Sequence, residues 1–263
     1  LGGTLLSIAA AAMARKGDDR LASMTLLAAQ MDFTEAGELT LFINESEVSF
    51  LEDMMWRNGY LDAAQMAGAF QLLRSNDLIW SRLQHEYLMG EKPHPNDMMA
   101  WNADTTRMPY RMHSEYLREL FLDNAFAAGK FEVDGHQITP REIRVPIFAV
   151  GTETDHVAPW KSAYKTGALT RSEVTFVLTN GGHNAGVVSE PGHHHRHYRM
   201  GRAYTNHHFV PADEWAENAE RHEGSWWLAW VDWLKAHQTG EPIEPPAMDT
   251  AICDAPGTYV LMR

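Results

Sequence analysis

The order of apolar and polar residues divides the chain into segments of two kinds. Some segments have the pattern of a buried strand, and others have the pattern of a helix. Residues 1–13 are rich in leucine and alanine, which favour a helix, and Gly17 with Asp18 is expected to end it. Residues 24–29 (MTLLAA) form a short apolar run that is typical of a buried parallel strand. The chain thus opens with a helix and then a strand, like the second part of a βαβ unit.

The same alternation returns after the middle of the chain. Two strands and two helices are expected there, over residues 145–151, 174–178, 158–168 and 226–236. These elements predict an α/β fold that holds the later strands of a parallel sheet with flanking helices. Residues 190–213 are rich in His, Pro and Gly, so we expect them to be irregular, and the Pro-rich tail from Gly240 is expected to be extended.

The intervening part of the chain has a helical pattern. It covers residues 46–56 and 62–73, the second of which opens with a capping box formed by Asp62 and Gln65. Methionine and aromatic residues are dense here, which suits a substrate path, a subunit interface or simply a filled core. We therefore expect residues 1–263 to form one catalytic domain, which is a partial one. A helical cap is expected to be inserted into it at residues of about 42–140.

The composition of the chain limits the classes of partner and the compartment that we expect for the protein. The formal net charge is -13, from 22 basic and 35 acidic residues, which argues against nucleic acid because phosphate binding needs a basic face. No apolar run has the length of a membrane span. The one cysteine, Cys253, cannot form an internal disulfide, which fits a reducing cytoplasm.

Two polar motifs follow the two later strands directly. Asp155 lies in Thr-Glu-Thr-Asp-His after the first, and His183 lies in Asn-Gly-Gly-His after the second. Functional groups gather at the carboxyl ends of parallel strands, and acid before histidine is the chain order of an α/β-hydrolase triad. Asp155 would then accept the Nδ1–H of His183, the general base. Taken singly, such an aspartate is more often a turn residue or helix cap, and such a histidine is more often structural.

The first residues match the end of a nucleophile elbow, G-x-nucleophile-x-G. Leu1 and Gly2 would be its last two positions, so the nucleophile would directly precede Leu1. The backbone N–H of Leu1 would donate to the oxyanion. Any other Gly-rich loop could begin in the same way.

The remaining histidines are weaker candidates. His156 could contact the site, but we expect it to orient the acid loop as a supporting residue. The cluster at residues 193–197 and the pair at 207–208 suggest metal binding, yet adjacent histidines on a loop rarely converge on one ion. We expect no metal site.

Segments from nearly the whole chain resemble polyhydroxyalkanoate synthases. They are residues 72–87 (LLRSNDLIWSRLQHEY), 100–107 (AWNADTTR), 113–120, 152–161 (TETDHVAPWK), 181–191 (GGHNAGVVSEP), 225–227 (SWW) and 256–261 (PGTYVL). Two of these segments, WNADTTR and GGHNAG, are not generic hydrolase features. The chain resembles the C-terminal catalytic part of this family, with an incomplete α/β-hydrolase fold.

The resemblance implies an acyltransferase that polymerises 3-hydroxyacyl-CoA into polyester with release of CoA. The family's catalytic aspartate and histidine map to Asp155 and His183, and its nucleophilic cysteine maps to the position before Leu1, which Cys253 does not match. It implies no cofactor, a homodimeric parent protein, and a cytoplasmic location at polyester granules. We expect the present chain alone to be inactive because it lacks the nucleophile, and one edge of its sheet to be unpaired.

Two other functions stay open. A serine α/β-hydrolase, such as an esterase or polyester depolymerase, would carry serine in place of cysteine before Leu1. A non-catalytic granule-binding homologue would use the same fold without turnover. Replacement of His183 by alanine in the parent protein separates the last alternative from the other two.

Overall fold

The computed structural model describes residues 1–62, 65, 80–81, 83–91, 97, 100–101, 107–205, 208–238, 240, 243–245, 247 and 251–259. The chain divides into two compact units. The sheet unit comprises Leu1–Glu45 and Tyr116–Gly240, and the second unit comprises Ser46–Glu115 and Glu241–Arg263.

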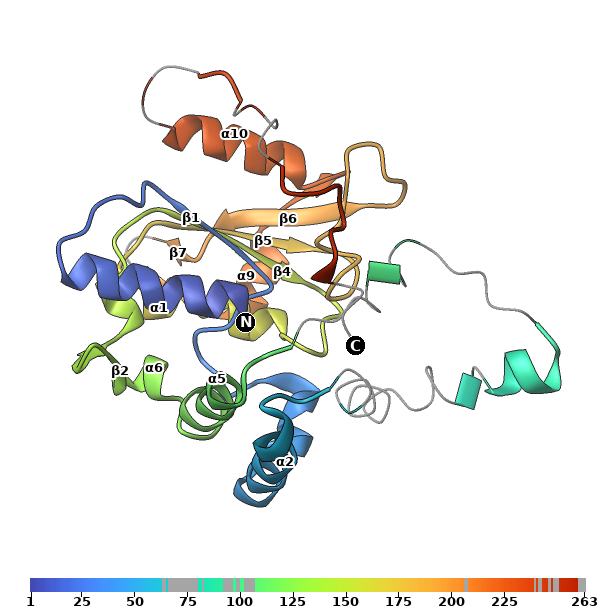
Figure 1. Ribbon diagram of the computed structural model, residues 1–263. Helices are drawn as coiled ribbons and strands as arrows, with labels where there is room; N and C mark the ends of the chain where they lie inside the picture. The colour runs from blue at the N-terminus through green and yellow to red at the C-terminus, as the bar shows by residue number, and fades with distance from the viewer. Residues whose placement is uncertain are drawn as a thin grey trace. The chain divides into compact units, whose positions relative to one another are not determined.

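The sheet unit is built on a five-stranded sheet with the strand order β1-β4-β5-β6-β9 (Figure 1). Its strands are β1 Met24–Leu27, β4 Ile147–Thr152, β5 Val174–Thr179, β6 His197–Arg202 and β9 Glu220–Glu223. The first three run parallel, with Leu27 beside Val150 and Val150 beside Val177. The order places β1 at one edge and β9 at the other.

The expectation of a parallel sheet is wrong for the other two strands. β6 runs antiparallel to β5, and β9 runs antiparallel to β6, so the sheet is mixed. The prediction of irregular structure over 190–213 is corrected by the same finding. Tyr198 and Met200 alternate along β6 and pack into a hydrophobic cluster, but this alternation is short and lies in a stretch whose His, Pro and Gly residues did not indicate a strand.

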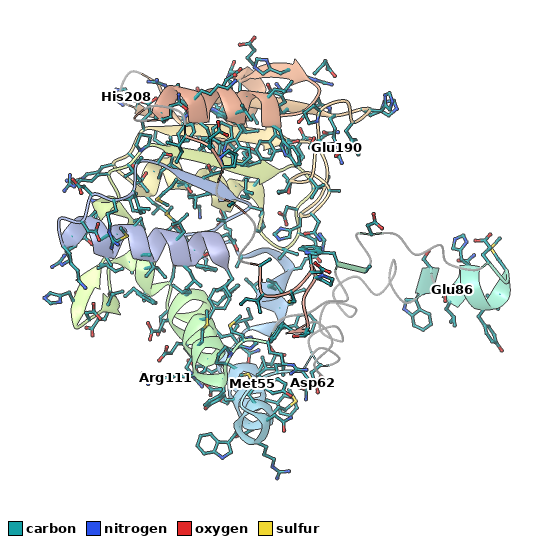
Figure 2. The ribbon with its side chains drawn as sticks, turned by 45° about the horizontal axis from the view of Figure 1, so that its top comes forward. Met55, Asp62, Glu86, Arg111, Glu190 and His208 are labelled. Atoms are coloured by element: carbon teal, nitrogen blue, oxygen red, sulfur yellow. The ribbon has the colours of Figure 1, made fainter. Side chains whose placement is uncertain are left out.

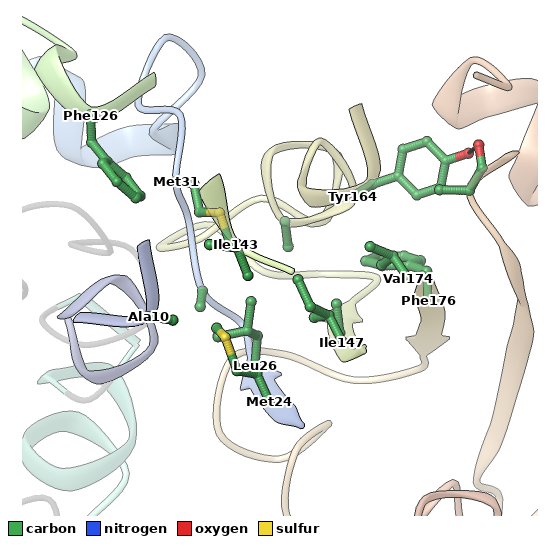
Figure 3. Close-up of a cluster of buried hydrophobic side chains, with 14 of the residues drawn as sticks. Ala10, Met24, Leu26, Met31, Phe126, Ile143, Ile147, Tyr164, Val174 and Phe176 are labelled. Carbon is green, nitrogen blue, oxygen red and sulfur yellow. Dashed lines mark hydrogen bonds between the residues drawn. The ribbon is translucent and has the colours of Figure 1, made fainter. Parts of the chain in front are cut away.

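Helices cover both faces of the sheet (Figure 1). They are α1 Gly2–Arg15, α7 Trp160–Tyr164, α8 Thr166–Leu169, α9 Ala212–Asn218 and α10 Trp227–His237. Successive side chains of β4 point to opposite faces. Ile147 and Ala149 therefore pack in the cluster with α1 residues such as Ala10 (Figure 3), whereas Phe148 and Val150 pack against α10.

These elements confirm most of the sequence pattern. The helix over residues 1–13, the strands, and the tryptophan-rich helix lie where they were expected, within a few residues at each end. Gly17 follows α1 with φ +73°, a conformation that glycine adopts at low cost, and Asp18 N donates to Met13 O at 2.9 Å to close the helix end. The helix expected over 158–168 is divided into α7 and α8.

Smaller elements complete the sheet unit. They are η1 Gly37–Phe42, η4 Tyr116–Leu122, α6 Ala125–Ala128, the hairpin of β2 Phe131–Val133 and β3 His136–Ile138, η5 Pro140–Glu142, and the pair β7 Tyr204–Thr205 and β8 His208–Phe209. The hairpin was not predicted, because it is short and lies within the range that the helical pattern suggested. No helix among the residues listed above is long and apolar enough to cross a membrane.

The elements in the described part of the second unit are helical. They are α2 Glu45–Asn58, η3 Leu83–Leu88 and α5 Tyr110–Glu115. The first residue of α2, Glu45, belongs to the sheet unit. Met55 is fully buried in this unit (Figure 2). The capping box is confirmed, since Asp62 N donates to Gln65 Oε1 at 3.0 Å and Gln65 N donates to Asp62 Oδ1 at 2.8 Å. Most of the helix expected to follow lies outside the described residues, and the cap insertion stays a prediction.

Candidate active site

Asp155 lies just beyond β4, in a tight turn. Its Oδ1 accepts hydrogen bonds from the backbone N–H of Val157 at 2.9 Å and of Ala158 at 2.8 Å. Its Oδ2 accepts from Thr152 Oγ1 at 3.0 Å and bonds to His183 Nδ1 at 2.7 Å. The Asp155 side chain is 0% exposed. Four contacts therefore fix both oxygens of one buried carboxyl group.

The protonation states follow from these contacts. Burial opposes ionisation of Asp155, but the hydrogen bonds from His183 and from the two backbone N–H groups outweigh it and keep the pKa of Asp155 below its ordinary value. An ionised carboxylate can only accept hydrogen bonds, so the Nδ1 atom of His183 that faces Asp155 carries a proton. Nε2 is then the nitrogen that can accept a proton from another group.

Close backbone packing shapes the turn that carries His183. A Cβ atom on Gly186 would lie 2.5 Å from Cγ2 of Thr152, and Gly181 has φ +104°. Thr154 N also donates to Gly181 O at 3.1 Å, which joins the acid loop to the histidine loop. Of the three glycines in the GGHNAG segment, Gly186 is therefore required by close approach and Gly181 by backbone conformation. The His183 side chain is 37% exposed, so solvent reaches part of the ring.

Leu1 lies at the carboxyl ends of the parallel strands, as Asp155 does. A Cβ on Gly3 would lie 2.4 Å from Cβ of Ala29, and Thr4 Oγ1 donates to Gln30 O at 2.8 Å. The start of α1 thus packs directly on the end of β1, and β1 is parallel to β4. The helix therefore packs tightly on the strand that follows it. The oxyanion role of the Leu1 N–H stays a prediction.

The backbone of His156 takes part in the support of the acid loop. Its carbonyl accepts from Glu38 N at 3.2 Å, and a Cβ on Gly37 would lie 2.5 Å from the same oxygen. The segment that follows β1 therefore lies against the acid turn. The expectation that His156 supports the site stays a prediction for its side chain.

Two supporting groups were missed by the sequence reasoning. One is the Thr152 hydroxyl on Asp155. The other is a buried polar chain in which Gln30 Nε2 donates to Ser162 Oγ at 3.1 Å and Ser162 Oγ donates to Asp32 O at 2.7 Å. This chain ties the segment after β1 to α7, which begins beyond the acid turn. A glutamine at the end of an apolar run was its only signal in the sequence.

Among the described histidine candidates, those on the loop at 193–195 are not among the contacts of Asp155 or His183. His193 Nδ1 lies 2.9 Å from Glu190 Oε1, and the rings of His194 and His195 are exposed with centroids 6.3 Å apart. Within the described ranges, no three histidine, cysteine or carboxylate side chains gather as a metal site would require. His208 lies in β8, and His207 lies outside the described residues. Cys253 is exposed in the second unit.

Fold and site together define an α/β protein with a buried aspartate and a histidine paired at the carboxyl edge of its sheet. No family model matches the chain. It is 39% identical to a poly(3-hydroxyalkanoate) polymerase of Methylorubrum extorquens, over 100% of this chain and 44% of the relative. Polymerase subunits of Rhizobium meliloti and Cupriavidus necator are 37% and 35% identical, over 100% and 99% of this chain.

The chain belongs to the poly(3-hydroxyalkanoate) polymerase family. It spans less than half the length of these relatives, 43% of the one from Rhizobium meliloti and 45% of the one from Cupriavidus necator. The resemblance predicted from the WNADTTR and GGHNAG segments is thereby confirmed.

Proposed function

We propose that this chain supplies the acid–base part of the active site of a polyhydroxyalkanoate synthase with an α/β-hydrolase fold. The observation that carries the proposal is the 2.7 Å contact between His183 Nδ1 and the buried carboxylate of Asp155. The polymerase relatives supply the reaction class. The substrate is a 3-hydroxyacyl-CoA thioester, and the products are a polyester and free CoA.

In the first step, His183 Nε2 removes the proton from the thiol of the cysteine that the resemblance places next to Leu1. The thiolate attacks the thioester carbonyl, and the backbone N–H of Leu1 donates to the oxyanion that forms. The carbon–sulfur bond to CoA then breaks, and His183 returns the proton to the leaving thiolate. Asp155 keeps Nδ1 protonated throughout and stabilises the charged imidazole.

In the second step, His183 removes the proton from the hydroxyl of another acyl unit. The hydroxyl oxygen attacks the acyl-cysteine, the new ester forms, and the cysteine sulfur leaves with the proton from His183. Each cycle therefore restores thiol and neutral histidine. The resemblance alone carries three further parts of this proposal: a homodimer, a helical cap over residues of about 42–140, and a cytoplasmic location at polyester granules.

The test replaces His183 by alanine in the natural full-length protein and measures CoA release from 3-hydroxybutyryl-CoA. We expect a loss of roughly a thousandfold or more, because general base and nucleophile activation disappear together. His193→Ala is the matched control, since that histidine also contacts a carboxylate but lies on an exposed loop. Unchanged release in His183→Ala would refute the proposal, and no release by the unmodified protein would favour a binding role. Free 3-hydroxybutyrate without polymer would favour a hydrolase.

A further inference from the structure

Two neighbouring tryptophans at the start of α10 donate hydrogen bonds to the backbone of the turn that follows His183. Trp226 Nε1 donates to Gly186 O at 3.1 Å, and Trp227 Nε1 donates to Val187 O at 3.0 Å. Each bond joins groups that are 40 residues apart in the chain. Two consecutive carbonyls of the histidine loop are thus held by two consecutive side chains of another element.

These carbonyls belong to a single turn with helix-type hydrogen bonds. Gly186 N donates to Gly182 O at 2.8 Å, and Val188 N donates to Asn184 O at 2.9 Å. A turn this short has no following residues to satisfy its last carbonyls, and such groups need other donors when they are shielded from water. The indole N–H groups fill this requirement and so fix where the turn ends.

Trp226 also contacts the strand that leads to the acid. Its ring is 1% exposed and stacks on Phe148 of β4, with centroids 6.2 Å apart and an interplanar angle of 27°. Asp155 follows the end of β4. One side chain therefore packs on the strand that carries the acid and bonds to the turn that carries His183.

The same segment is anchored by a third donor. The hydroxyl of Ser225 donates to Ser189 O, and it accepts from Trp227 N at 3.1 Å. The side chain of Ser225 thus bonds both to the first residue of α10 and to the end of the histidine loop. Three consecutive residues, Ser-Trp-Trp, are joined in this way to the segment from Gly186 to Ser189.

We propose that Trp226 and Trp227 are positioning residues for His183. Their indole N–H groups hold the turn so that Nδ1 of His183 faces Asp155. This inference rests on the proposed function, in which His183 is the general base. The tryptophans touch no reacting atom and act through the backbone of the turn. Tryptophan suits the role because it combines a large apolar ring with one donor at its edge.

The test replaces Trp227 by phenylalanine in the natural full-length protein, which keeps a ring and removes the N–H. We expect kcat for CoA release to fall about tenfold while KM stays within about twofold, because the histidine would be misplaced in the acylation transition state. We also expect amide deuterium exchange in residues 183–188 to accelerate about tenfold, since the turn loses a hydrogen bond that opposes its opening.

Trp230→Phe is the matched control. Trp230 lies on the same helix, and its Nε1 donates to Thr25 Oγ1 of β1 at 2.9 Å, so the substitution removes the same kind of bond from a different target. We expect kcat and the exchange of residues 183–188 to stay within about twofold of the unmodified protein. Thermal melting of both variants measures the structural cost that they share.

Trp226→Phe is the second test variant. If this variant does not fold, because Trp226 is the more buried of the two residues, Trp227→Phe alone decides the test. The inference is overturned if Trp227→Phe leaves kcat and exchange within about twofold, or if Trp230→Phe reproduces both changes. The exchange measurement needs no turnover. It therefore still decides the inference if His183→Ala releases CoA as fast as the unmodified protein, which would refute the proposed function instead.

Discussion

Among the described residues of the sheet unit, two histidine Nδ1 atoms make close contacts with a carboxylate, and the two contacts differ in the carboxylate. Asp155 lies 2.7 Å from His183 and Glu190 lies 2.9 Å from His193. The two histidine side chains are 37% and 39% exposed, nearly the same. The Asp155 side chain is 0% exposed, whereas that of Glu190 is 55% exposed and lies on a loop at the margin of the sheet unit (Figure 2).

The difference shows that contact distance does not by itself identify a catalytic pair. Glu190 and His193 are three residues apart, so one turn brings them together without any help from the fold. Asp155 and His183 are 28 residues apart and meet because β4 and β5 are paired in parallel register. Three other groups fix the carboxyl group of Asp155, and such fixed, buried groups give a histidine one tautomer and one orientation.

The sharpest test of this comparison is Asp155→Asn beside Glu190→Gln. The N–H groups of Val157 and Ala158 would keep the amide oxygen at the Oδ1 position, so the amide NH2 would face His183 Nδ1. Nδ1 would then have to accept, Nε2 would carry the proton, and the ring could not act as a base. We expect CoA release to fall by roughly a thousandfold or more in Asp155→Asn.

Glu190→Gln should leave CoA release within about twofold, because the exposed pair is screened by solvent and lies further along the connection between β5 and β6. The measurement is kcat for CoA release from 3-hydroxybutyryl-CoA by both variants of the full-length protein. A comparable loss in Glu190→Gln would show that the comparison assigns the wrong pair.

The sequence was informative about the Asp155 pair because chain order and strand position together specify where side chains meet. The strand before Asp155 and the strand before His183 could be recognised from apolar runs, and parallel pairing then placed both residues at one edge. The antiparallel return of β6 could not be recognised, because its alternation of apolar and polar residues is short and includes only Tyr198 and Met200 as apolar positions. The hydroxyl of Thr152 and the donors of Trp226 and Trp227 depend on tertiary packing, which no local pattern encodes.

A smaller effect should separate two glycines beside His183. A Cβ on Gly186 would lie 2.5 Å from Thr152 Cγ2, whereas the nearest atom to a Cβ on Gly182 is 3.7 Å away. Gly186→Ala must therefore displace either the histidine turn or β4, which overpacking data suggest costs about 1–3 kcal/mol. We expect kcat to fall about tenfold or more in Gly186→Ala and to stay within about threefold in Gly182→Ala.

Steady-state CoA release and thermal melting of the two alanine variants check this prediction. Equal losses in both would mean that close packing on Thr152 does not distinguish the turn. A loss of melting temperature without a loss of kcat in Gly186→Ala would show that the turn can shift while Asp155 and His183 keep their contact.

The smallest effect concerns the acid dependence of stability. The pKa of Asp155 lies below its ordinary value of 3.8 because hydrogen bonds, chiefly from His183, outweigh its burial. The folded protein therefore binds fewer protons at this carboxyl than the unfolded chain does. The stabilisation that results is complete above the unfolded pKa and is lost as the pH falls through the lower folded pKa.

Urea unfolding of the full-length protein, followed by tryptophan fluorescence at pH 7, 5 and 3, measures this contribution. We expect the unmodified protein to be more stable than Asp155→Asn by on the order of 1 kcal/mol at pH 7, and the difference to shrink at pH 3. The pKa of Glu190 is also lowered, by its hydrogen bond to His193, but that pair is exposed. Glu190→Gln should therefore match the unmodified protein at every pH, and a pH-dependent difference there would remove the distinction between the two pairs.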